Sequence, residues 1–107
     1  MTPDEVNLIA KRARRETMRW LLLVTINLWR PTDAMVSSLR PVIVGVYPDA
    51  TDMEILRELD YLVERDLLSM RTDPLGQSRV KMERYGMDIV EYTVDCEPGI
   101  ARPQAGG

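Results

Sequence analysis

The stretch that most constrains the fold is residues 51–82, which predicts a capped helix followed directly by a two-stranded hairpin. The hydroxyl of Thr51 can accept the amide of Glu54, and Glu54 can reach back to the amide of Thr51, which is the capping-box pattern. Apolar residues then recur at helical spacing from Ile55 to Leu67, and charged residues fall mostly on the other face. We therefore expect a helix that begins at Thr51 and ends near Leu67.

The hairpin is predicted from a turn signal and from a change of period. The sequence DPLG at residues 73–76 places Asp, Pro and Gly at the positions of a tight turn that each of them favours. Residues 68–72 and 78–82 flank this turn and are expected to pair. In the second arm, apolar residues alternate with Arg79 and Lys81, as in a half-buried strand. Arg79 and Lys81 should therefore point outward on one face.

The first helix is expected to begin within residues 2–5, where a second capping box and a proline mark a helix start. It should end near Trp29, because Pro31 disfavours a helical residue before it. Its second half carries more apolar surface than one small core can bury, which favours a homodimer. The residues expected at that interface are Trp20, Leu21, Leu23 and Leu28.

The same region has a competing interpretation as a secretory signal peptide, with a basic segment at residues 11–15 and an apolar segment at residues 20–29. The apolar run is too short to span a bilayer, and no convincing cleavage site follows it. The amphipathic stripe also continues through the basic segment. We favour a core helix, no membrane partner and a cytoplasmic location, which the single cysteine, Cys96, also fits.

A second helix is expected from a cap at Thr32 or Asp33 to about Gly45, with a kink at Pro41. The β-branched run at residues 42–47 allows a short strand as the alternative. The helix is favoured because the apolar spacing continues across the proline.

The C-terminal part should hold one more short helix, at residues 83–92, although Gly86 weakens it. Residues from 93 onward have neither a helical nor a strand period and are rich in Pro and Gly. The expected organisation is one domain over residues 1–92 and a flexible tail over residues 93–107.

Composition argues against catalysis. The 107 residues contain no His and one Cys, which removes the commonest general base and the usual sets of zinc ligands. No pair of carboxylates is singled out as acid and base, and no glycine-rich phosphate loop is present. We expect no catalytic residues, no metal, no cofactor and no enzymatic activity.

The order of helix, helix, capped helix, hairpin and helix resembles a winged helix-turn-helix domain. The residues that carry the resemblance are YPDATDMEI, LDYLVERDLLS, the hairpin tip DPLG and MERYGMDIV. It implies a mainly α fold with a small β-hairpin: a three-helix core, a wing and a short C-terminal helix. The helix at residues 51–67 would then enter the major groove of DNA, and the loop at residues 73–78 would lie along the backbone.

The segment EYTVDCEPGIARP is also similar to the end of small winged-helix proteins of Mu-like transposable phages and prophages. That resemblance implies a phage setting more than a mechanism, because members of the group mostly lack an assigned biochemical role.

The candidate DNA contacts are polar residues of the capped helix and basic residues of the hairpin. They are Thr51, Arg57, Tyr61, Arg71, Arg79 and Lys81. The simpler interpretations are a solvated helix face with local ion pairs and edge-strand charges that prevent aggregation. The first helix also carries a basic stripe of Lys11, Arg12, Arg15 and Arg19. A solvated face is the favoured interpretation of this stripe, and binding to nucleic acid or to an acidic partner is the alternative.

Charge is distributed unevenly and leaves two functions open. Residues 1–30 hold six basic and three acidic side chains, whereas residues 31–66 hold three basic and eight acidic ones. Acidic residues expected on the capped helix face, Asp52, Glu54, Glu58 and Glu64, oppose binding to a polyanion, so phosphate contacts should come mainly from the wing. The first function is a DNA-binding, phage-type transcriptional regulator that is expected to be a dimer. The alternative is a protein-interaction module in phage assembly, whose acidic helix docks a basic partner without binding DNA.

Overall fold

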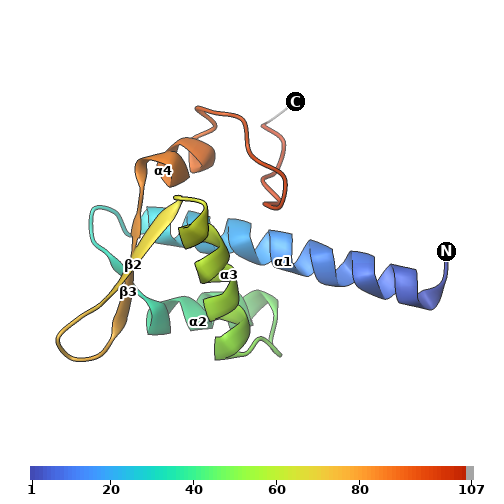
Figure 1. Cartoon of the computed structure of the whole chain (residues 1–107), viewed down its shortest axis with the longest axis horizontal. Helices are drawn as coiled ribbons and strands as arrows, with labels where there is room; N and C mark the ends of the chain where they lie inside the picture. Colours follow the sequence, from blue (N-terminus) through green and yellow to red (C-terminus); the bar gives the residue numbers. More distant parts are fainter. Residues whose placement is uncertain (106–107) are drawn as a thin grey trace.

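The structure, a computed structural model, describes residues 1–105 and is mainly helical with a small antiparallel sheet, as the sequence predicts (Figure 1). The described elements, in chain order, are α1 (Pro3–Leu28), β1 (Ala34–Met35), α2 (Val36–Val46), α3 (Asp52–Glu64), β2 (Leu68–Thr72), β3 (Ser78–Met82) and α4 (Arg84–Val90).

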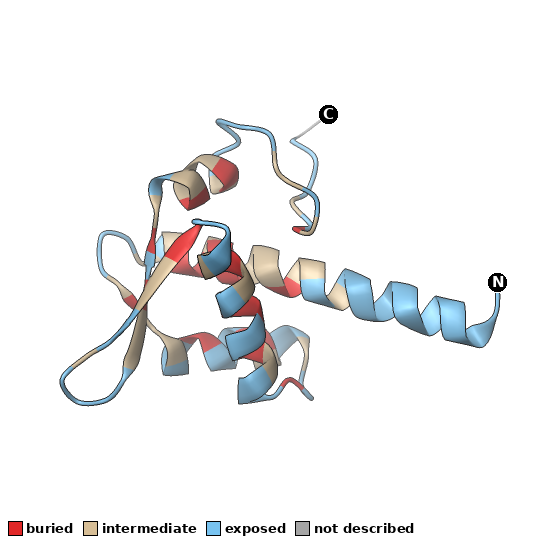
Figure 2. Cartoon of the chain, in the orientation of Figure 1, coloured by how far each residue is buried: buried red, intermediate tan, exposed pale blue. Residues whose placement is uncertain are grey.

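Helix α1 begins and ends where its local signals predict. The Thr2 hydroxyl accepts the amide of Glu5 at 3.2 Å, and Pro3 occupies the first turn, where its missing N–H costs nothing. Trp29 caps the other end. The N-terminal half of the helix projects from the body of the molecule, and residues 1–13 are all exposed (Figure 2).

A two-residue strand that the sequence did not reveal changes the start of the second helix. Ala34 pairs with Val80, and Met35 pairs with Arg79, so the sheet order is β1-β3-β2. The expected cap at Thr32 or Asp33 is therefore wrong, because α2 begins only after this extended pair, with Met35 as a cap that lacks a side-chain hydrogen bond. Helix α2 does continue across Pro41 to Val46, so the helix is confirmed over the strand.

The hairpin is confirmed in register, from Leu68 opposite Met82 to Thr72 opposite Ser78. Its turn is closed by the Gly76 amide, which donates to the Asp73 carbonyl at 2.9 Å, and Gly76 adopts a φ of 80° that favours glycine. Asp73 also accepts the amides of Gln77 and Leu75 through its side chain. The Gln77 amide is the main cause that lowers the pKa of the Asp73 carboxyl.

The core lies where α1, α2, α3 and α4 meet one face of the sheet. Fully buried side chains from the helices and the hairpin form this core, among them Met18, Leu22, Leu39, Ile43, Leu59, Val80 and Ile89. The alternation expected in β3 is confirmed, because Val80 is buried and Lys81 is exposed.

The C-terminal segment, residues 93–105, packs against the body of the protein, which differs from the flexible tail expected over residues 93–107, and residues 106 and 107 lie outside the described part of the chain. Residues 93–105 form no helix or strand, but the Ile100 side chain is buried in the core. The Ala101 amide donates to the Glu16 carbonyl of α1 at 3.1 Å, and Arg102 donates to the carbonyls of Ile89 and Val94. The apolar residues of this stretch follow neither a helical nor a strand period, so the sequence carried no signal for the docking of Ile100.

Replacing glycine with alanine is expected to have opposite effects on stability at two helical positions, Gly86 and Gly45. A Cβ on Gly86 of α4 would collide with the Leu67 carbonyl oxygen, whereas a Cβ on Gly45 of α2 would meet nothing within 4 Å. We expect Gly86→Ala to destabilise the fold by about 1–3 kcal/mol through overpacking. The matched change Gly45→Ala should stabilise it by about 0.5–1 kcal/mol, since alanine favours a helix. Urea unfolding of both variants measures the contrast, and equal effects would contradict it.

Candidate nucleic-acid interface

Helix α3 is oriented by its cap and by its buried face. The Thr51 hydroxyl accepts the Glu54 amide at 3.1 Å, as predicted, so the cap already engages this candidate DNA contact. Ile55, Leu59 and Leu62 are buried against the core. The opposite face of α3 is therefore the one that is available to a partner.

The acidic face expected on α3 is different in the structure, because two of its four carboxylates turn toward α1. Glu54 binds Arg14 at 2.8 Å, and Glu58, which is 1% exposed, binds Arg19 at 2.8 Å. Arg14 also binds Asp49, and this hydrogen bond lowers the pKa of the Asp49 carboxyl. The expected charge conflict with DNA is reduced accordingly.

Tyr61 is part of a stack that joins α3 to its neighbours. The guanidinium of Arg19 lies 3.5 Å from the centre of the Tyr61 ring, and that of Arg65 lies 3.6 Å from it. Arg19 also donates to the Gly99 carbonyl, so the stack ties α1, α3 and the C-terminal segment together. Because its ring lies against two guanidinium groups, Tyr61 is placed for a structural role.

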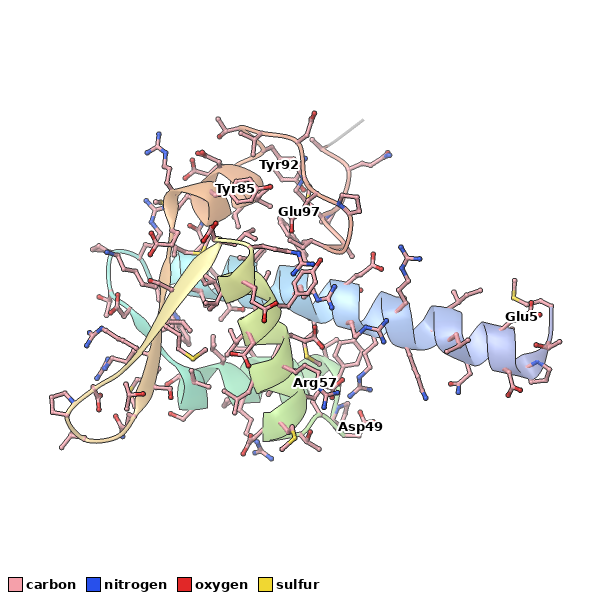
Figure 3. All side chains as sticks on the ribbon, viewed as in Figure 1. Glu5, Asp49, Arg57, Tyr85, Tyr92 and Glu97 are labelled. Carbon is pink, nitrogen blue, oxygen red and sulfur yellow. The ribbon has the colours of Figure 1, made fainter. Side chains whose placement is uncertain are left out.

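The C-terminal segment is also anchored by the carboxylate of Glu97 (Figure 3). The Tyr85 hydroxyl donates to Glu97 at 3.2 Å, and Arg65 lies 3.4 Å from the other oxygen of that carboxylate. Burial, followed by the charge of Glu97, raises the pKa of the Tyr85 hydroxyl.

The hairpin of β2 and β3 offers fewer unpaired cations than the sequence suggests. Arg71 binds Asp33 at 3.1 Å, and Arg79 binds Asp73 at 3.0 Å. Lys81 is exposed and makes no ion pair within residues 1–105. Asp33 and Asp73 both lie in loops outside the strands. The turn signals in the sequence do not indicate that either carboxylate contacts an arginine, so these ion pairs were not predictable.

Three cations without an ion pair in the described part of the chain gather elsewhere. Lys11 and Arg15 of α1 and Arg57 of α3 line a hollow of about 390 Å³ between the two helices. Its lining also includes Arg14, which is paired with Asp49 and Glu54, and Glu58, which is paired with Arg19. Figure 3 shows Arg57 near Asp49 at this side of α3. The basic stripe expected on α1 is thus divided, since Arg19 is bound to Glu58 and Arg12 to Glu16.

The outer face of α3 is mixed in character. Met53 and Leu56 are exposed there at 69% and 40%, and Asp60 is exposed beside them. Arg57 contributes positive charge to this face and Glu64 negative charge. Such a surface fits an apolar contact with a protein at least as well as it fits a DNA groove.

The four residues expected at a dimer interface are placed very differently. Leu23 is fully buried in the core and is not accessible to a second chain. Trp20 packs edge-on against Tyr92, with ring centres 6.2 Å apart, and Leu21 is half-buried. Leu28 remains exposed. The apolar excess of α1 is therefore largely used by α4 and the C-terminal segment.

No group of three His, Cys, Asp or Glu side chains within residues 1–105 is arranged to hold a metal ion. Burial raises the pKa of the Cys96 thiol, which lies 3.9 Å from the Ile100 carbonyl. A thiol with a raised pKa is a poor nucleophile at neutral pH.

No protein family model, curated protein or solved structure matches this chain. Among the described residues, no helix is both long enough and apolar enough to cross a bilayer.

Proposed function

We propose that this protein is a winged-helix domain that binds double-stranded DNA, and that it serves as a small phage- or prophage-type transcriptional regulator. The observation that carries the proposal is the hollow lined by Lys11, Arg15 and Arg57, where cations without ion-pair partners gather beside the exposed face of α3. The order of three helices followed directly by a hairpin supports it by analogy of fold.

Phosphate binding requires cations that are not already neutralised by an ion pair. This requirement decides which part of the protein can contact the DNA backbone. Affinity for DNA depends mainly on Lys and Arg side chains that replace counterions on phosphates. Because Arg71 and Arg79 are each bound to an aspartate, the wing supplies chiefly Lys81. We therefore assign the main phosphate contacts to α1 and α3 instead of to the wing, with Arg57 closest to the base edges.

The proposal predicts the salt dependence of binding. Replacing Lys11, Arg15 and Arg57 together with Ala should flatten the slope of log K against log salt by roughly 3, one unit per lost phosphate contact. The matched variant Arg71→Ala/Arg79→Ala should change the slope by less than about 1. A fluorescence titration with nonspecific duplex DNA at two or more salt concentrations measures both.

Two outcomes would count against this site. A wild-type protein that does not bind duplex DNA at low salt contradicts DNA binding itself. A wing variant that loses more slope than the triple variant would move the phosphate contacts to the hairpin, as the sequence first suggests.

The second candidate is a protein-interaction module, for example in phage assembly, and the outer face of α3 favours it. Met53 and Leu56 offer an apolar patch there, with Asp60 and Glu64 as acidic neighbours for a basic partner. Under this function Asp60→Lys/Glu64→Lys would break a protein complex without affecting the core. Reversal of Glu54 or Glu58 is not a clean test, because both carboxylates bind α1.

A further inference from the structure

The projecting half of α1 carries an apolar stripe that nothing else in residues 1–105 covers. Val6 and Ile9 are 51% and 55% exposed, and Ala13 continues the stripe one turn further. These residues are three and four positions apart, so they share one face of the helix. We call residues 3–13 of α1 the arm, and Figure 2 shows it exposed along its length.

The body of the protein covers α1 only as far as the start of this arm. The C-terminal segment reaches back along α1 to Glu16, where the Ala101 amide is bound, and Trp20 meets Tyr92. The arm extends a helix that the body of the protein already nucleates, so it stays helical while its apolar side chains face water. The arm therefore has both the reason and the exposed surface to pack against another helix.

The charged residues beside the stripe, Glu5 and Arg12, would form opposite-charge pairs between two copies of α1 that pack antiparallel. Glu5 and Arg12 are seven residues apart, which places them on the same flank of the stripe, two turns from each other. Figure 3 shows Glu5 near the free end of α1. In two antiparallel helices the same flanks face each other, so each Glu5 lies near the Arg12 of the partner subunit.

Arg12 has capacity for this contact. Its Nε donates to Glu16 at 2.8 Å, but its side chain is 71% exposed and the two terminal nitrogens make no hydrogen bond within the described residues. Lys11 and Arg15 line the hollow beside α3, so Arg12 is the basic residue of the arm that we assign to the contact with Glu5 of the partner subunit.

We propose that the occupant of this stripe is a second copy of the chain, paired antiparallel through Val6, Ile9 and Ala13. The pairing is two-fold symmetric, because each contact of Glu5 with Arg12 of the partner subunit occurs twice. Two short arms bury less than the roughly 800 Å² per partner of a standard interface, so the dimer is weak and depends on concentration. This inference does not rest on DNA binding.

The first test compares two adjacent exposed apolar residues on the same arm. Ile9 lies on the stripe, whereas Leu8, which is 67% exposed, lies outside it. In sedimentation equilibrium we expect Ile9→Lys to raise the dimer dissociation constant at least about tenfold, and Leu8→Lys to change it less than about threefold. Both changes lie outside the folded body, and circular dichroism checks that each arm remains helical.

The second test identifies the antiparallel orientation. Glu5→Arg and Arg12→Glu should each weaken self-association, because each homodimer would contain two like-charged pairs. An equimolar mixture of the two variants should associate more strongly than either alone, since both pairs become opposite in the mixed dimer.

Three results would overturn the proposal. The first is a wild-type chain that stays monomeric up to about 1 mM, the range of the weakest specific complexes. The second is an equal loss of association for Leu8→Lys and Ile9→Lys. The third is a mixture of the charge variants that associates no better than its components.

Discussion

Replacing Arg19 with Met is expected to destabilise the protein by about 3–5 kcal/mol, because it leaves the buried carboxylate of Glu58 without its counter-charge. Arg19 binds Glu58 at 2.8 Å, and the Glu58 side chain is almost completely shielded from water. The same guanidinium donates to the Gly99 carbonyl and lies against the Tyr61 ring. The substitution therefore also loosens the C-terminal segment.

The change is measured as the free energy of unfolding in urea, with two comparisons. Arg14→Met removes a pair that is much more open to solvent, and should cost about 1 kcal/mol or less. The double variant Arg19→Met/Glu58→Leu should recover most of the loss, because the buried charge is then gone from both sides. A loss below about 1 kcal/mol for Arg19→Met would mean that water reaches Glu58.

Leu59→Ala is expected to cost about 2–5 kcal/mol, because it removes a fully buried side chain and leaves a cavity that the surrounding helices cannot close. Leu59 lies on the inner face of α3 and belongs to the hydrophobic core. The result reports on the orientation of α3, which also fixes where Arg57 points.

Leu56 provides the matched control on the same helix. It is the same residue type, one turn earlier, and is 40% exposed on the outer side. We expect Leu56→Ala to cost less than about 1 kcal/mol, since little of its surface is removed from water. Equal losses for Leu56→Ala and Leu59→Ala, or a loss below about 0.5 kcal/mol for Leu59→Ala, would show that α3 presents a different face to the core.

Elements whose cause is local were predictable from the sequence. The caps at Thr2 and Thr51 depend on hydrogen bonds across three residues, and both hydroxyls accept the expected amides. The Glu54 carboxylate, which was expected to return to the Thr51 amide, binds Arg14 instead. The hairpin follows from its turn and from a period of two, and its strands pair exactly over the predicted residues 68–72 and 78–82. In each case the interaction that decides the conformation lies within a few residues.

The candidate site was predictable only as a list of residue types. Arg57 on α3 and the basic residues of α1 were identifiable from helical spacing. Their pairing was not, because Arg14 meets Glu54 and Arg19 meets Glu58 across about forty residues of chain. The packing of α1 against α3 decides that Arg14 and Arg19 are neutralised, whereas Lys11 remains available.

The sequence by itself thus determined the helices, the caps of α1 and α3 and the hairpin, since each depends on contacts between near neighbours. The tertiary structure alone decided the strand at Ala34, the burial of Ile100 and the division of charges between α1 and α3. A two-residue strand, a lone isoleucine and a distant ion pair have no period along the chain. Each is created when segments far apart in sequence meet, and no local pattern records that meeting.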